Sequence, residues 1–205
     1  MKTKQQGFTL MELMIVMVII GILAAAFAGV GGSMFSKSKE RAAKARMQSL
    51  AIMLQSYRTM EGEYPDDRLP KGTTSNRFNS HSEALFLALF DPEYSGERPA
   101  QDWLVNTDGD ETTRNLTILQ SRELFEIGDE WGNPIVYFES LHYSNKTGAT
   151  VQAGEDEYYE EQNVSPGRSE RTGSFYEPSG FQLVSAGADG LFETEDDLFS
   201  YTGDQ

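Results

Sequence analysis

The chain has 205 residues, of which 17 are basic and 32 acidic, so its formal net charge is −15, and it contains no cysteine. Residues 1–60 carry a net charge of +6, whereas residues 61–205 carry −21. Such an acidic carboxyl-terminal part argues against general nucleic-acid binding, because phosphates would be repelled. The lack of cysteine excludes disulfides, and the length allows one modest globular domain beside an apolar amino-terminal segment.

A polar leader and a long apolar run open the chain. Residues 7–12 have the sequence GFTLME, and the run continues to Val30, so about 23 residues are available to span a bilayer. Glu12 is the single charge in this run, although a carboxylate in a membrane helix costs on the order of 3 kcal/mol. An ordinary anchor or an uncleaved signal is one interpretation. However, a secretory signal has a shorter apolar core, and its cleavage site follows that core.

The order of glycine, apolar run and early glutamate resembles the class III signal of type IV prepilins and type II secretion pseudopilins. The resemblance implies that prepilin peptidase, a membrane aspartyl peptidase, cuts after Gly7 and methylates the new amino terminus at Phe8. It also implies a role in assembly for Glu12, which becomes the fifth mature residue. By the positive-inside rule, the basic residues after the run would place the carboxyl-terminal part of the chain, called the head below, in the cytoplasm. The resemblance places the head outside, and we follow the more specific signal.

Residues 8–60 are predicted to form one long helix, about 80 Å at 1.5 Å per residue. Apolar residues at spacings of three and four give its second half a stripe that should cover a sheet. This stripe consists of Ala43, Met47, Leu50, Leu54 and Tyr57. The side chains of Lys37, Lys44 and Arg46 are expected to be solvated. A glycine cluster at residues 29–32 indicates either local melting in a filament or close packing against neighbouring helices.

Shorter elements are predicted in the middle of the chain. Residues 61–65 should end the long helix, residues 66–80 should form a loop, and a capping box at residues 80–83 should start a short helix. Residues 91–115 have no regular pattern. Within them, the sequence NTDGD at residues 106–110 has oxygen ligands at alternate positions, as a calcium loop would. It lacks the glycine at the sixth position and the glutamate at the twelfth, so we expect a solvated turn.

Two strands are predicted in the segments that follow. Residues 116–127 fit either a helix or a strand, and the sequence WGNP at residues 131–134 predicts a turn that leads into a strand. This turn resembles a segment of the major pseudopilin of type II secretion. Residues 140–178 are acidic and rich in turn formers, which favours an inserted loop. Residues 181–185 are predicted to form a short strand.

An acidic loop near the carboxyl terminus is the candidate metal site. The sequence LVSAGADG at residues 183–190, with EDDL at residues 195–198, resembles the calcium loop of the major pseudopilin. Calcium takes six to eight hard oxygens, and a glycine-rich turn allows carbonyls and carboxylates to converge. The expected ligands are the carboxylates of Asp189, Asp196 and Asp197 and the carbonyl oxygens of Val184 and Leu191. The alternative is a solvated acidic loop with an Asp-Gly turn.

No pattern in the sequence indicates catalysis. His81 and His142 are isolated in polar surroundings, and both are expected at the surface. The chain has no cysteine nucleophile, no phosphate-binding glycine loop and no zinc spacing. We therefore do not expect an enzyme.

Together these features predict an α+β, pilin-like fold. A long amino-terminal membrane-embedded helix should pack on a small antiparallel β-sheet with long loops. The expected organisation is a leader at residues 1–7, a transmembrane and polymerisation helix at residues 8–36, and a periplasmic head at residues 37–205. The head includes the second half of the long helix and is held at the inner membrane by a single pass.

The resemblance implies a structural subunit of a type II secretion-type pseudopilus, assembled as a homo-oligomeric helical filament in the periplasm to drive protein export. The implied partners are prepilin peptidase, other pseudopilins, the inner-membrane assembly platform and, before assembly, membrane lipid. Calcium is the expected cofactor, and no nucleic acid is expected. Two alternatives remain open. One is a type IV pilin subunit for adhesion, motility or DNA uptake, and the other is a membrane-tethered binding module or enzyme.

Overall fold

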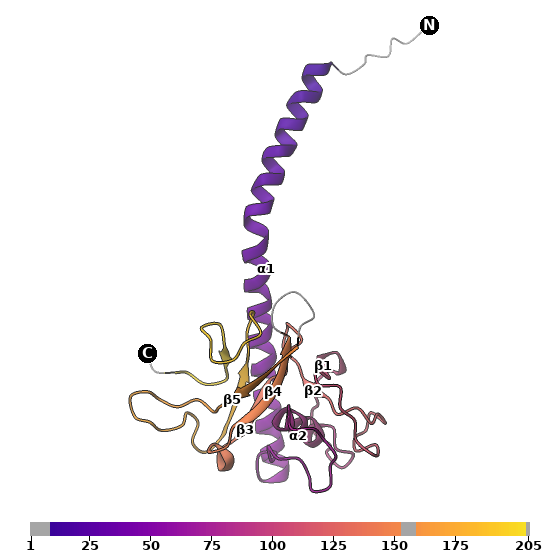
Figure 1. The fold of residues 1–205 in the computed structure, drawn as a ribbon, viewed down its shortest axis with the longest axis vertical. Helices are drawn as coiled ribbons and strands as arrows, with labels where there is room; N and C mark the ends of the chain where they lie inside the picture. Colours follow the sequence, from indigo (N-terminus) through magenta and orange to yellow (C-terminus); the bar gives the residue numbers. More distant parts are fainter. Residues whose placement is uncertain (1–8, 153–158, 204–205) are drawn as a thin grey trace. The chain divides into compact units, whose positions relative to one another are not determined.

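The structure, a computed structural model, describes residues 9–152 and 159–203, and it leaves out the side chains of residues 24–35. The chain divides into two compact units, Met1–Lys39 and Glu40–Gln205. Helices and small antiparallel sheets make the fold α+β, as the sequence predicts (Figure 1).

Helix α1, Leu10–Glu61, is uninterrupted, which confirms the prediction of one long helix. Its backbone stays helical through the glycine cluster at residues 29–32, and no proline occurs before its end to break it. The helix ends where Gly62, with φ +91°, turns into the left-handed conformation and donates a hydrogen bond to the carbonyl of Arg58. Melting of the glycine cluster in a filament stays a prediction.

The second half of α1 brings its apolar stripe into the core of the second unit. Ala43, Leu50 and Leu54 are fully buried, Met47 is 3% exposed, and Tyr57 is half-buried. Figure 1 shows this part of α1 running behind the strands of the head. The core that it joins also contains Leu85, Leu89, Leu124, Ile127, Ile135 and Leu183. The prediction that this stripe covers a sheet is therefore confirmed.

The central sheet is antiparallel, with the strand order β3-β6-β7. Its strands are β3, Val136–Glu139, β6, Phe181–Ser185, and β7, Leu198–Phe199. In its register Val136 lies opposite Val184, and Ser185 lies opposite Leu198. The predicted strand at residues 181–185 is thus confirmed. The turn at residues 131–134 precedes β3 as expected, with Gly132 at φ +87°.

Two smaller antiparallel sheets and three short helices complete the described elements of the head. Strand β1, Leu104–Val105, pairs with β2, Glu126–Ile127, and β4, Thr147–Gln152, pairs with β5, Tyr159–Val164. The helices are α2, Ser80–Leu89, and the 3-10 helices η1, Gln101–Trp103, and η2, Ser140–His142. Residues 116–127 were expected to form a helix or a strand, and within them only Glu126–Ile127 form a strand, β2.

The predicted loop at residues 140–178 is wrong where the chain forms β4 and β5. Ala149, Val151 and Val164 from these strands are buried in a second apolar cluster that also contains Phe138. The outward positions of β5 are charged or polar, and this polarity hid the strand pattern in the sequence. Burial of one face against β3 was decided by tertiary contacts.

The predicted capping box at residues 80–83 is also wrong. Asn79 occupies the N-cap position of α2 with φ +53°, and no side chain caps this helix. The carboxylate of Glu83 instead accepts a hydrogen bond from Ser75 Oγ at 2.9 Å. The Asn79 side chain donates to Glu126 at 3.0 Å, so a tertiary hydrogen bond has replaced the local one.

The expectation that Arg46 is solvated is wrong as well. Its side chain is only 13% exposed, and its Nη1 donates to the carbonyl oxygens of Gly128 at 2.7 Å and Asp129 at 3.0 Å. Its Nη2 pairs with the Glu130 carboxylate. Lys37 and Lys44, by contrast, are exposed as predicted. Arg46 therefore joins α1 to the turn before β3.

Candidate functional site

The start of α1 is the first candidate site. Thr9 and Glu12 form a capping box there: the Thr9 N–H and Oγ1 each donate to Glu12 Oε2 at 2.8 Å. In return, the Glu12 N–H donates to Thr9 Oγ1 at 3.2 Å. The predicted cleavage and methylation residues, Gly7 and Phe8, lie outside the described residues. Glu12 therefore sits at the helix terminus that processing at Gly7 would expose.

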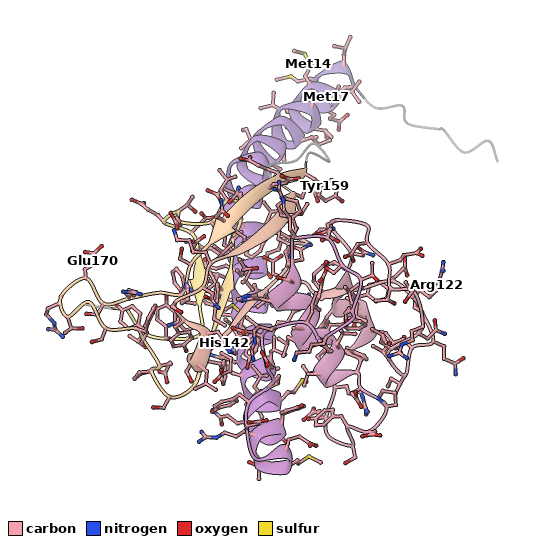
Figure 2. All side chains as sticks on the ribbon, turned by 60° about the horizontal axis from the view of Figure 1, so that its bottom comes forward. Met14, Met17, Arg122, His142, Tyr159 and Glu170 are labelled. Atoms are coloured by element: carbon pink, nitrogen blue, oxygen red, sulfur yellow. The ribbon has the colours of Figure 1, made fainter. Side chains whose placement is uncertain are left out.

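Apolar side chains surround α1 over its first turns. The large apolar residues between Leu10 and Leu23 are 45–78% exposed, and Figure 2 shows Met14 and Met17 projecting from the helix. A helix that is apolar on all faces requires an apolar environment. Among the described residues, no helix combines the length and the apolarity that crossing a membrane requires. The transmembrane helix at residues 8–36 stays a prediction.

The carboxyl-terminal loop leaves β6 through a tight turn at Gly187. This residue has φ +63°, and a Cβ added to it would lie 2.2 Å from the carbonyl oxygen of Asp196, so only glycine fits. Asp196 Oδ2 accepts hydrogen bonds from the N–H of Ala188 at 2.6 Å and of Asp189 at 2.9 Å. Asp196, one of the predicted ligands, thus holds the loop closed by accepting hydrogen bonds from two backbone N–H groups.

The other predicted ligands lie in differing surroundings. Asp189 Oδ1 accepts a hydrogen bond from the N–H of Leu191 at 2.8 Å. Asp197 Oδ2 accepts one from the N–H of Glu193 at 2.8 Å, whereas its Oδ1 is buried and no described residue bonds to it. Burial raises the pKa of Asp197 to about 6. Val184 lies inside β6, with β3 on one side and β7 on the other.

Two sets of side chains converge tightly enough to hold a metal ion, and neither is the predicted one. Within the part of the chain that the structure describes, the sets whose ligand atoms lie within 4.8 Å of one another are Asp66, Asp67 and His142, and Glu83, Asp108 and Asp110. The carboxylates of Asp189, Asp196 and Asp197 do not form such a set. Calcium at the carboxyl-terminal loop stays a prediction.

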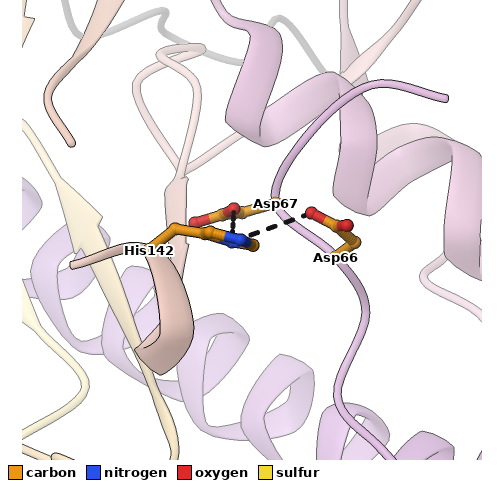
Figure 3. Close-up of side chains that lie close together, drawn as sticks. All are labelled: Asp66, Asp67 and His142. Carbon is orange, nitrogen blue, oxygen red and sulfur yellow. Dashed lines mark hydrogen bonds and ion pairs between the residues drawn. The ribbon is translucent and has the colours of Figure 1, made fainter. Parts of the chain in front are cut away.

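The two histidines are neither isolated nor at the surface, which corrects the sequence-based expectation. His142 Nδ1 lies 2.7 Å from Asp67 Oδ1 and 3.8 Å from Asp66 Oδ1 (Figure 3). His81 Nδ1 lies 3.7 Å from Asp67 Oδ2, which also accepts the N–H of Glu139 at 3.0 Å. Burial lowers the pKa of His81, and the charge of Asp67 opposes this shift.

This histidine and aspartate cluster joins elements that are distant in sequence. Asp67 is fully buried and comes from the loop after α1, whereas His81 belongs to α2 and His142 to η2. Both oxygens of the Asp67 carboxylate have hydrogen-bond partners, Oδ2 with the N–H of Glu139 and Oδ1 with His142. This buried carboxylate therefore holds the loop after α1 against β3 and η2. Each histidine occurs singly in the sequence, and no local pattern could have indicated their common partner.

The turn at residues 106–110 forms as predicted, but it is only partly solvated: Gly109 is exposed, whereas the other residues of the turn are half-buried. Asn106 Oδ1 accepts the N–H of Gly109 at 2.8 Å, and Gly109 has φ +69°. Both carboxylate oxygens of Asp108 are buried, and no described residue donates a hydrogen bond to them. The alternating oxygen ligands were the one signal in the sequence. Glu83, the carboxylate that lies close to Asp108 and Asp110, belongs to α2 and is distant in sequence.

Comparison with known proteins identifies the amino terminus. A family model for the prokaryotic N-terminal methylation motif matches residues 2–28, a stretch that includes Gly7, Phe8 and Glu12. The chain therefore carries a type IV pilin-like signal. This signal implies processing by prepilin peptidase, an initial membrane anchor and assembly with other subunits into a filament. No curated protein and no solved structure matches the chain.

Proposed function

We propose that the protein is a structural subunit of a type II secretion-type pseudopilus. The observation that carries this proposal is the methylation motif at residues 2–28, which includes the first turns of the 52-residue helix α1. The resemblance of residues 131–134 and 183–190 to the major pseudopilin favours a pseudopilus over a pilus. Prepilin peptidase, other pseudopilins and the inner-membrane platform are the proposed partners, and the head lies in the periplasm.

Glu12 is proposed to set the register between subunits. Cleavage after Gly7 gives Phe8 a cationic amine, and the Glu12 carboxylate of a neighbouring subunit is a partner of opposite charge. Both hydrogen bonds that Thr9 makes to this carboxylate fall on Oε2. Pairing in an apolar filament core removes the free-energy cost of two isolated charges, and a subunit that slips leaves both unpaired.

The first experiment tests processing. The full chain, in a host that contains prepilin peptidase, should be cut to begin at Phe8, whereas Gly7→Leu should leave the precursor intact. Mass spectrometry of the membrane fraction distinguishes the two species. A mature amino terminus at Phe8 in the Gly7→Leu variant would contradict the proposal.

Assembly is tested with Glu12→Gln, which keeps an oxygen for the helix cap and removes the charge. This variant should be cleaved normally, but the yield of sheared filaments should fall by about tenfold or more. Glu61→Gln, at the other end of α1, is the matched control and should assemble normally. Normal filament yield from Glu12→Gln would refute the pairing role. Retractable filaments on the cell surface would instead support a type IV pilin subunit.

We also propose that the carboxyl-terminal loop binds calcium through Asp189, Asp196 and Asp197. The support is the tight Gly187 turn together with the buried, unbonded Oδ1 of Asp197. A metal clip would order this loop in a chain that has no disulfide.

A further inference from the structure

Four carboxylates from three elements meet beside α2. Glu83 comes from α2, Asp108 and Asp110 come from the loop after β1, and Glu126 comes from β2. One ligand oxygen from each of Glu83, Asp108 and Asp110 lies within 4.8 Å of the others. Helix α2 packs against β2, and Figure 1 shows the two close together. These residues are far apart in sequence, and the fold alone brings them together.

The oxygens of this cluster lack the hydrogen bonds that buried polar atoms normally have. Glu83 is fully buried, and its Oε1 has no hydrogen-bond partner among the described residues. The same holds for both oxygens of Asp108 and for Asp110 Oδ1. Four buried oxygens on three neighbouring carboxylates are therefore unsatisfied.

Three of the four carboxylates are nevertheless held in place from outside the cluster. Ser75 Oγ donates to Glu83 Oε2 at 2.9 Å, and the N–H of Asn76 donates to Asp110 Oδ2 at 3.1 Å. Glu126 Oε2 accepts the N–H of Thr107 at 3.1 Å and so positions the start of the turn. The unsatisfied oxygens of Glu83 and Asp110 thus belong to side chains that are already oriented.

The electrostatics of the cluster are unfavourable without a cation. Burial, reinforced by the negative charges of Asp110, Asp108 and Glu126, raises the pKa of Glu83 to about 10. Burial, reinforced by the negative charge of Asp110, also raises the pKa of Asp108, and burial raises the pKa of Glu126. Such a group must either take up a proton or find a counter-ion.

We propose that Glu83, Asp108 and Asp110 bind a calcium ion. The donor set is all oxygen, which suits calcium and not zinc or copper. Asp108 has both oxygens available and can bind in a bidentate manner, as calcium permits. Magnesium demands a tighter octahedral shell and retains more water, so it should bind more weakly.

The structure also shows how the incomplete calcium loop in the sequence could be completed. Residues 106–110 have alternating oxygen ligands but lack a closing glutamate further along the loop. Glu83 stands close to these ligands in space, although it comes from another element. The ion would then dock the turn after β1 onto α2. This site is separate from the carboxyl-terminal loop, and it does not depend on the proposed pseudopilus function.

The test uses the full chain in non-ionic detergent, stripped with chelator and then titrated with calcium chloride. Both tryptophans, Trp103 and Trp131, lie in the head, so their fluorescence follows its unfolding. Calcium should raise the melting temperature of the parent chain. In the Asp108→Asn and Glu83→Gln variants, the calcium-dependent increase in melting temperature should be smaller than in the parent chain. In chelator, both variants should melt no lower than the parent, because each replaces a buried carboxyl group, which must be protonated or left as an unpaired charge, with a neutral amide.

Calorimetric titration gives the direct measurement of binding. Asp108→Asn should weaken calcium binding at this site by about tenfold or more. Asp102→Asn is the matched control, since Asp102 is an exposed residue of the nearby η1, and it should bind calcium like the parent. The proposal is overturned if Asp108→Asn and Glu83→Gln retain the full calcium-dependent rise and the parent affinity. It is equally overturned if Asp189→Ala alone abolishes all calcium binding.

Discussion

At the residue scale, Arg46 connects α1 to the turn before β3. Its guanidinium donates to two backbone carbonyls, pairs with Glu130 and lies 5.0 Å from the centre of the Trp103 ring. The same turn is bonded internally, since Asp129 accepts the N–H groups of Trp131 and Asn133. Arg46 therefore fastens a preformed turn to the helix.

Replacing Arg46 should destabilise the head. Arg46→Ala leaves the buried Gly128 carbonyl without its donor and the Asp129 carbonyl with only the N–H of Gly132, at 3.3 Å. We expect a loss of about 2 kcal/mol in the free energy of unfolding. Arg46→Lys should recover only part of this loss, because an ammonium lacks the planar fork that reaches several acceptors. Urea unfolding followed by circular dichroism measures the difference. Arg41→Ala, at an exposed position of the same helix, is the control, and equal midpoints for the Arg41 and Arg46 variants would refute this role.

At the scale of elements, the carboxyl-terminal loop depends on its backbone geometry before any ion is considered. Gly187 permits the close approach to Asp196, and the carboxylate of Asp196 then bonds two amides of the opposite side. Asp197 keeps one buried oxygen without a bond from the described residues. The loop is thus a formed structure in which Asp197 keeps a buried ligand oxygen available.

The proposed calcium clip is best tested in the Asp108→Asn background, which should weaken the calcium site proposed beside α2. Calcium at a hundredfold excess over a dissociation constant of about 0.1 mM should stabilise the head by about 2.7 kcal/mol. Adding Asp189→Ala or Asp197→Ala should remove most of this stabilisation, whereas adding Asp102→Ala should not. Thermal unfolding with calcium and with chelator provides the comparison. If neither loop variant reduces the calcium effect, the loop is only an acidic surface.

At the scale of the whole molecule, negative charge is concentrated in the head. Residues 61–205 carry a net charge of −21, and they contain both acidic sites discussed above. Repulsion among these carboxylates opposes the compact state and is screened by salt. Calcium and ionic strength should therefore act on stability in the same direction.

Salt alone should stabilise the head in chelator. Raising sodium chloride from about 0.1 M to about 1 M shortens the Debye length from about 10 Å to about 3 Å. We expect the melting temperature to rise by about 3 °C, equivalent to about 1 kcal/mol for a domain of this size. Choline chloride at equal concentration should have the same effect, which separates screening from sodium binding. A melting temperature that stays constant or falls would show that repulsion in the head is unimportant.

Features that depend on neighbouring residues could be predicted from the sequence. The methylation motif, the uninterrupted helix with its apolar stripe and the strand at residues 181–185 each rest on a local pattern, and the structure or the family match supports each one. Helical and strand periodicity act over a few residues, so they can be recognised without knowledge of the fold. Glycine at residue 187 could be placed in a turn for the same reason.

Tertiary structure alone decided where buried polar groups found their partners. Asn79 reaches Glu126, His142 reaches Asp67, and Arg46 reaches the turn before β3. Side chains that looked like a helix cap or a solvated surface were redirected because burial makes an unsatisfied polar group costly. Such pairings form only when folding brings residues that are distant in sequence together in a packed core. A local sequence pattern does not contain this information.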